Sequence, residues 1–133
     1  MTQSSRAEGA DRLAEITARV VAFAEEREWN RFHDPKNLAM ALASEVGELS
    51  AILRWVSTDD ADDFCAQPDM MARLEAEVGD IGILLLLLTQ RLGIDLPAAV
   101  AAKLDVNAAN YPVSNSRGRS ERPRRERVDN RLR

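Results

Sequence analysis

The feature that most constrains the fold is a run of aliphatic residues in the middle of the chain. Residues 81–88 read Ile-Gly-Ile-Leu-Leu-Leu-Leu-Leu. The run is too short to cross a bilayer, which takes about 20 residues of helix. As part of a helix it is apolar on nearly every side, and a helix without a polar face must be covered all round. We therefore expect a second copy of the chain to complete its cover; a central helix within a monomer is the alternative.

The rest of the chain shows the periodicity of amphipathic helices and no sustained alternation typical of a β-strand. Gly93 is expected to end one helix, and Asp95 is expected to cap the next. Residues 58–68 carry four aspartates and are expected to form a loop. The predicted fold class is all-α, a protomer of four antiparallel helices. The four helices are predicted over residues 10–28, 36–57, 69–91 and 95–110.

The formal charge of −4 is the sum of two unlike segments. Residues 114–133 hold eight arginines and three acidic residues, a net charge of +5, so residues 1–113 carry −9. We expect residues 1–113 to form the folded domain and residues 114–133 to form a flexible, solvated, arginine-rich tail. The acidic domain is a poor surface for nucleic acid, although a weak contact through the tail is an alternative.

Cysteine and histidine usage narrows the chemistry. The chain has one cysteine, Cys65, and one histidine, His33, which excludes a disulfide framework and a histidine-rich metal site. The first residues are polar and lack the apolar segment of a secretory signal. The expected compartment is therefore the cytoplasm, without membrane association.

Two acidic motifs interrupt the apolar stripes of the second and third predicted helices. One reads Glu-Val-Gly-Glu over residues 45–48, and the other reads Glu-Val-Gly-Asp over residues 77–80. Residues three apart share a helix face, and Glu45 and Glu77 each occupy a position of the stripe itself. Burying an unpaired carboxylate costs several kcal/mol, so these side chains need a compensating partner.

Four inward carboxylates on neighbouring helices repel one another unless cations lie between them. Hard divalent ions suit oxygen ligands, and Mg²⁺ binds carboxylates together with phosphates, with Mn²⁺ as the alternative ion. A di-iron site of the ferritin type needs Glu-x-x-His pairs, which this chain lacks. Gly47 and Gly79 lie within the motifs and predict a close approach of helix backbones. An ordinary amphipathic surface is the alternative for the motifs.

A wider set of segments carries a family resemblance. They are residues 23–33, 35–42, 45–49, 77–80 and 95–97, together with Trp55, Lys103, Asn107 and Tyr111-Pro112. In these segments the chain resembles the MazG-like all-α nucleoside triphosphate pyrophosphohydrolases, most closely the branch that contains dCTP pyrophosphatase. The resemblance covers about residues 12–118.

The resemblance implies Mg²⁺-dependent hydrolysis of (deoxy)nucleoside triphosphates between the α and β phosphates. The products are a nucleoside monophosphate and pyrophosphate, and the role is the control or cleaning of the nucleotide pool. A homodimer or homotetramer is expected through the leucine-rich third helix. The implied metal ligands are Glu45, Glu48, Glu77 and Asp80, with Glu48 favoured as the catalytic base. The implied phosphate-binding residues are Lys103 and Asn107, and the implied base-binding residues are Trp29, Phe32, His33 and Trp55.

Three positions depart from the dCTP-type pattern. Val20, Leu84 and Asn110 stand where that pattern commonly has a histidine, a tyrosine and a basic residue. They bear on base and phosphate recognition, so the sequence does not determine the preferred base. The alternative function is a non-catalytic helical module that binds a nucleotide or a partner around a structural metal ion. For the aromatic residues, the alternative role is core packing.

Overall fold

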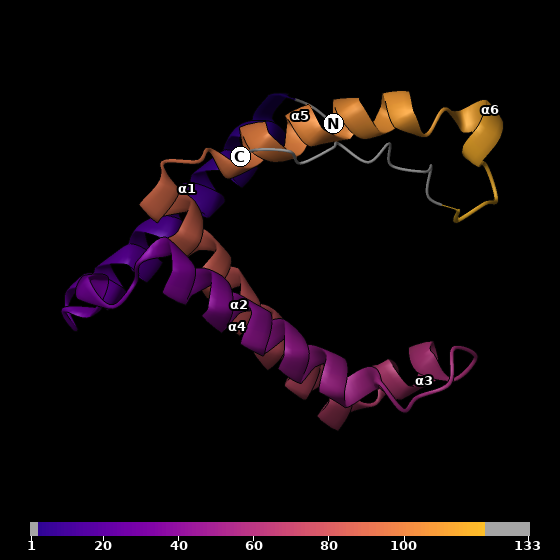
Figure 1. The fold of residues 1–133 in the computed structure, drawn as a ribbon, viewed down its shortest axis with the longest axis horizontal. Helices are drawn as coiled ribbons and strands as arrows, with labels where there is room; N and C mark the ends of the chain where they lie inside the picture. The colour runs from indigo at the N-terminus through magenta and orange to yellow at the C-terminus, as the bar shows by residue number, and fades with distance from the viewer. Residues whose placement is uncertain (1–2, 122–133) are drawn as a thin grey trace, which may run out of the picture. The chain divides into compact units, whose positions relative to one another are not determined.

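A computed structural model describes residues 3–121 of the 133, with side chains from Arg12 onward. Within residues 3–121 the chain forms helices and connecting turns and contains no β-strand (Figure 1). The predicted all-α class is confirmed. No single helix of this part of the chain is long and apolar enough to span a membrane. Six of the eight arginines of the predicted tail, from Arg122 onward, lie outside the described residues.

The helices fall into two compact units, Met1–Ile94 and Asp95–Arg133. The first unit contains α1 (Gln3–Glu25), the 3-10 helix η1 (Trp29–Arg31), α2 (Pro35–Leu53), α3 (Ala61–Ala66) and α4 (Pro68–Leu92). The second unit contains α5 (Leu96–Asn110) and α6 (Val113–Ser116). The predicted division into residues 1–113 and 114–133 stays a prediction, because most of the tail lies outside the described part.

All four predicted helices are present, and several of their ends differ from the prediction. α1 begins at Gln3 instead of residue 10, since no proline interrupts these first residues. It ends at Glu25, because Glu28 adopts a left-handed conformation with φ 54° that a helix cannot contain. α2 ends at Leu53, four residues before the predicted end.

The prediction of a loop over residues 58–68 was wrong for its central part. Residues Ala61–Ala66 form the short helix α3. Asp62 and Asp63 lie in its first turn, where negative side chains interact favourably with the positive end of the helix dipole. The aspartates that made the segment look like a loop therefore stabilise the start of a helix.

Three helix ends follow local signals in the sequence. Asp34 caps α2, and its Oδ1 accepts a hydrogen bond from the backbone N–H of Asn37 at 2.9 Å. Asp95 caps α5 in the same way, accepting from the N–H of Ala98 at 2.9 Å. Gly93 ends α4 in the left-handed region with φ 65°. The predicted roles of Asp95 and Gly93 are confirmed.

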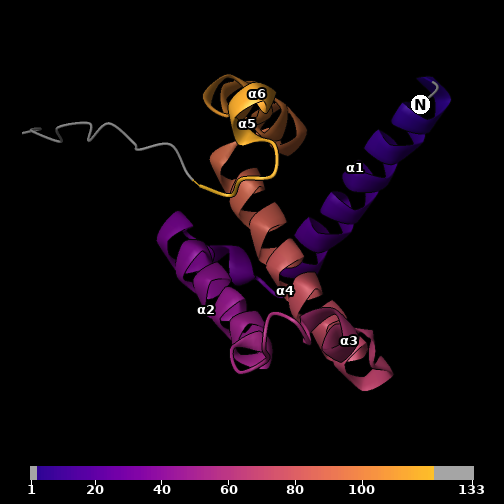
Figure 2. The same ribbon diagram turned by 90° about the vertical axis from the view of Figure 1, so that its right-hand side faces the viewer.

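α4 is the central helix of the first unit. Figure 1 and Figure 2 both show α2 and α4 side by side and antiparallel, and α1 and α3 also contact α4. Among the described residues the buried side chains are few: Val20, Ala24, Leu38 and Thr89. The leucines from residue 84 to residue 88 are only half-buried, and Ile83 is 41% exposed. The aliphatic run thus lies in the central helix of the first unit, but a single chain covers it incompletely.

Candidate active site

Three carboxylates meet where α2 and α4 lie side by side. Glu45 and Glu48 come from α2, and Glu77 comes from α4. One carboxylate oxygen from each residue lies within 4.8 Å of the other two. Glu45 and Glu77 are half-buried, whereas Glu48 is exposed. We call these three residues the carboxylate cluster; they are three of the four predicted metal ligands.

The negative charge of the carboxylate cluster is not balanced within the described chain. Removal from water raises the pKa of Glu45, and the negative charges of Glu48, Asp80 and Glu77 raise it further. Asp80 thus acts on the cluster electrostatically although it is not one of its three members. Within residues 12–121, the one ion pair joins Arg27 to Glu26 and not to a cluster carboxylate.

One oxygen of the carboxylate cluster is both buried and unpartnered. Glu77 Oε2 has no hydrogen-bond partner among the described residues. A buried acceptor of this kind costs free energy unless a proton or a cation satisfies it. The ligand atoms are all carboxylate oxygens, which suit a hard divalent cation better than a soft one. The residues present therefore fit a divalent metal ion.

The two glycines of the acidic motifs do not behave as expected. A Cβ atom added at Gly47 or at Gly79 would meet no atom within 4 Å among the described residues, apart from its chain neighbours and the backbone of its own helix. The predicted close approach of helix backbones at these positions was therefore wrong within one chain. The reason is that both glycines are exposed and lie away from the contact between α2 and α4.

A row of rings runs from the end of α1 into the connector between α1 and α2. The ring of Trp29 packs edge-on against Phe23, with 5.6 Å between the ring centroids, and against His33 at 6.1 Å. His33 Nδ1 is buried and has no hydrogen-bond partner among the described residues. Phe32 is more exposed, at 56%, and its ring lies 4.8 Å from the Arg31 guanidinium carbon. The structure thus groups Trp29 with His33, whereas Phe32 faces Arg31.

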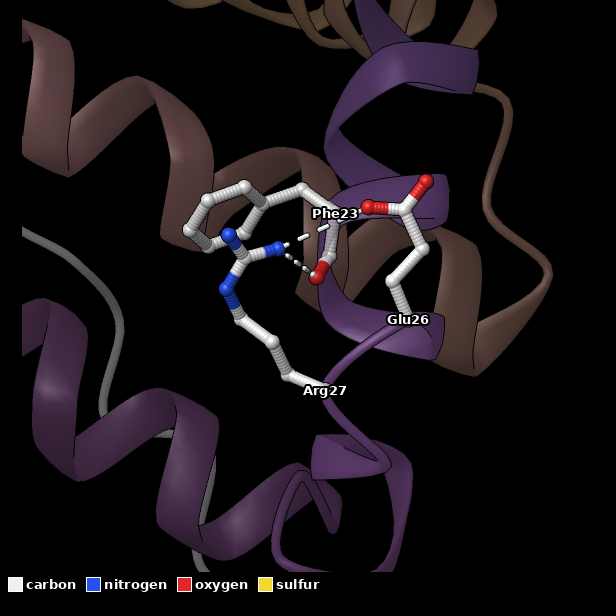
Figure 3. Close-up of polar contacts among 3 residues, drawn as sticks. All are labelled: Phe23, Glu26 and Arg27. Atoms are coloured by element: carbon white, nitrogen blue, oxygen red, sulfur yellow. Dashed lines mark hydrogen bonds and ion pairs between the residues drawn. The ribbon is translucent and has the colours of Figure 1, made fainter.

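Arg27, two residues after the end of α1, lies over the Phe23 ring of this row (Figure 3). Its guanidinium carbon lies 3.6 Å from the centroid of the Phe23 ring, and its Nη1 donates to the Phe23 carbonyl at 3.0 Å. Nη1 also lies 3.6 Å from Glu26 Oε2. Neither Phe23 nor Arg27 was assigned a role from the sequence. Their spacing of four residues at the end of a helix was the available signal.

Trp55 is remote from the other predicted base-binding residues within one chain. It follows the C-terminal end of α2 and is 89% exposed. The connector with Trp29 and His33 precedes the N-terminal end of the same helix. α2 has 19 residues and so is about 28 Å long. The predicted base-binding set is therefore divided between opposite ends of α2.

The predicted phosphate-binding residues lie in the second unit. Lys103 and Asn107 are four residues apart on α5 and so share one face of it. Lys103 is exposed and Asn107 is half-buried. The Asn107 carbonyl accepts a hydrogen bond from the N–H of Tyr111 at 2.8 Å, which ends the helix.

Comparison with known proteins places these features in a family. No family model matches the chain. A dCTP pyrophosphatase 1 from Rattus norvegicus is 42% identical over 106 residues, which cover 80% of this chain and 62% of that protein. The Homo sapiens protein of the same name is 37% identical over 110 residues, 83% of this chain and 65% of the relative. The chain thus spans less than two thirds of the length of these curated relatives.

One solved structure is covered by this chain over nearly its whole length. A pyrophosphatase from Archaeoglobus fulgidus matches with a TM-score of 0.71 and 31% identity, over 76% of this chain and 93% of that one. The chain belongs to the MazG-like all-α nucleoside triphosphate pyrophosphohydrolase family. The resemblance predicted from the motif segments is confirmed. The departures from the dCTP-type pattern lie at a buried residue of α1 (Val20), a half-buried one of α4 (Leu84) and the last residue of α5 (Asn110).

Proposed function

We propose that this member of the family is a metal-dependent nucleotide pyrophosphohydrolase. It hydrolyses (deoxy)nucleoside triphosphates between the α and β phosphates, giving a nucleoside monophosphate and pyrophosphate, and so controls or cleans the nucleotide pool. The observation that carries the proposal is the carboxylate cluster with its unpartnered Glu77 oxygen. The names of the relatives support the reaction class, and the predicted compartment remains the cytoplasm.

Each carboxylate has a proposed task that follows from its exposure. Glu45 and Glu77 are half-buried and would hold the ion, with Asp80 as a further ligand on α4. A bound Mg²⁺ or Mn²⁺ ion would offset the phosphate charge and lower the pKa of a bound water. Glu48 is exposed and lies beside the two half-buried carboxylates, so we assign it the general-base role. It would accept a proton from the attacking water, whose oxygen would form the new bond to phosphorus as the bond linking the α and β phosphates breaks and pyrophosphate separates from the monophosphate.

The remaining predicted residues are assigned to nucleotide recognition. The rings of Trp29 and His33 pack edge-on against each other, and we assign them to binding of the base. Stacking of a base on an aromatic ring contributes about 1–3 kcal/mol. Phe32 lies in the same connector, and Lys103 and Asn107 would contact the phosphates. The relatives are named for dCTP, so dCTP is the first nucleotide to test. Val20 and Leu84 are apolar where that pattern has hydrogen-bonding side chains, so a panel of bases is needed.

We also propose a homodimer or homotetramer that covers α4. A groove of about 710 Å³ separates α1 from α4 and is lined by apolar side chains such as Phe23, Ile83 and Leu86. Only three hydrophobic residues are buried among those described, which is little for a stable core. A base pocket that combines Trp55 with Trp29 would need two copies, since α2 separates them. Sedimentation should give a dimer or tetramer, and a monomer at micromolar concentration would contradict this assembly.

The reaction is tested by pyrophosphate release from a panel of nucleoside triphosphates, using the full chain with and without Mg²⁺. We expect release only with the metal, and a loss of about 100-fold or more in kcat for Glu48→Gln. Glu75→Gln is the matched control, because Glu75 is an exposed glutamate of α4 outside the carboxylate cluster. Folded, metal-loaded protein that releases no pyrophosphate from any nucleotide would favour the non-catalytic binding module instead.

A further inference from the structure

The connector between α1 and α2 joins the two halves of the proposed site. The connector carries Trp29 and His33, whereas Glu45 and Glu48 lie in the second half of α2. A nucleotide that contacts both halves requires a fixed distance and orientation between them. That relation depends on how the connector is attached to the first turn of α2.

Asn37 makes that attachment with both its backbone and its side chain. Its Nδ2 donates a hydrogen bond to the Phe32 carbonyl at 3.0 Å, and its backbone N–H donates to Asp34 Oδ1 at 2.9 Å. Among the described residues, the Phe32 carbonyl accepts no other hydrogen bond. Asn37 is exposed, so its side chain adds little to the packing of the core.

Backbone hydrogen bonds connect Phe32, and so the side chain of Asn37, to the residue that carries the Trp29 ring. The Phe32 N–H donates to the Trp29 carbonyl at 2.8 Å, and the His33 N–H donates to the same carbonyl at 3.1 Å. Residues 29–33 thus form one small hydrogen-bonded unit. Pro35 begins α2, and its ring restricts φ at that residue. The remaining backbone freedom between this unit and α2 therefore lies in the residues between Phe32 and Asn37, which the Asn37 side chain bridges.

We propose that Asn37 is a positioning residue for the nucleotide, holding the unit of Trp29 and His33 at a fixed place relative to the carboxylates of α2. This inference rests on the proposed function. Removal of the Asn37 side-chain bond frees the connector, while the carboxylates stay in place through the contact between α2 and α4. Binding therefore suffers more than the chemical step. We expect KM to rise about fivefold, the effect of one lost hydrogen bond, with kcat changed less than twofold.

The experiment compares Asn37→Ala and Asn37→Asp with Ser50→Ala. The aspartate variant keeps the size of the side chain, loses the Nδ2 donor, and places a favourable negative charge in the first turn of α2. Ser50 is the matched control, because its exposed side chain also donates to a backbone carbonyl, that of Val46 at 2.8 Å, but within α2. The steady-state kinetics use the full chain and the best nucleotide of the panel.

A second measurement follows Trp29 itself. In a Trp55→Phe background, acrylamide quenching reports the exposure of Trp29, which is 42% in the intact chain. We expect acrylamide to quench Trp29 fluorescence more strongly in both Asn37 variants than in the parent protein, and equally in Ser50→Ala and the parent. An active wild type whose Asn37 variants keep their KM and their quenching overturns this inference alone. A wild type that releases no pyrophosphate overturns the proposed function, and the role of Asn37 in nucleotide binding falls with it.

Discussion

Glu45 of α2 and Glu77 of α4 place carboxylate oxygens within 4.8 Å of each other. The two residues come from helices joined by a turn and by α3, and the antiparallel contact of α2 with α4 brings them together. Two like charges at this distance are unfavourable without a cation or a proton between them. The pairing is therefore the structural basis of the proposed metal site.

Removal of one ligand should weaken metal binding directly. Glu77→Gln keeps the shape of the side chain but replaces the unpartnered buried oxygen with an amide. We expect the affinity for Mn²⁺ to fall at least tenfold, measured by calorimetry or electron paramagnetic resonance. Glu75→Gln should bind Mn²⁺ as the wild type does. Equal affinities for the two variants would place the metal elsewhere.

The pH dependence of stability should also report the carboxylate cluster. Because the pKa of Glu45 is raised in the folded chain, the folded chain holds that proton more tightly than the unfolded chain does. The resulting stabilisation is complete below the unfolded pKa and is lost as the pH rises through the folded pKa. We expect the free energy of unfolding of the metal-free chain to decrease over that range, and to decrease less in Glu45→Gln. Urea unfolding in EDTA at a series of pH values measures this free energy for the wild type and for Glu45→Gln. The same dependence on pH in the two proteins would contradict a raised pKa of Glu45 in the folded chain.

The cap of α2 should contribute measurably to stability. Asp34→Ala leaves the Asn37 N–H without its acceptor, and we expect a loss of about 1 kcal/mol in the free energy of unfolding. Gln67 precedes α4 in the equivalent position but makes no side-chain cap bond, so Gln67→Ala is the control and should change stability by less than about 0.5 kcal/mol. A similar loss in both variants would show that the cap bond is not the cause.

The contact of Arg27 with Phe23 should be energetically coupled. A guanidinium over an exposed aromatic ring contributes about 0.5–1 kcal/mol. In a double-mutant cycle of Arg27→Ala and Phe23→Leu, we expect a coupling free energy of that size in urea unfolding. The same cycle for Arg31 and Phe32, whose separation is larger at 4.8 Å, should give a smaller value. Additive effects of Arg27→Ala and Phe23→Leu would contradict the contact.

Much of the site's framework was predictable because helical spacing determines it. Glu45 and Glu77 occupy positions of apolar stripes, and such positions face a neighbouring helix whatever side chain they carry. Asp95 and Gly93 were predictable for a related reason, since caps depend on local hydrogen bonding and on a positive φ. The helical class follows from the same periodicity.

Other features depend on geometry that spacing does not encode. The bond from Asn37 to the Phe32 carbonyl forms only because the connector turns back at that residue. Trp29 and Trp55 lie far apart because the whole length of α2 separates them. The motif residues alone do not show this distance. α3 was missed because aspartates are common in loops as well as at the start of helices, and composition does not separate the two.

Identification of the products by ³¹P NMR determines whether the chain cleaves between the α and β phosphates and whether this cleavage needs a metal ion. The chain is incubated with dCTP and Mg²⁺, and the spectra are compared with those of an EDTA control and of Glu48→Gln. We expect dCMP and pyrophosphate in equal amounts from the wild type, none in EDTA, and a strongly reduced yield from the variant. Orthophosphate with dCDP, or products that persist in EDTA, would contradict a metal-dependent cleavage between the α and β phosphates.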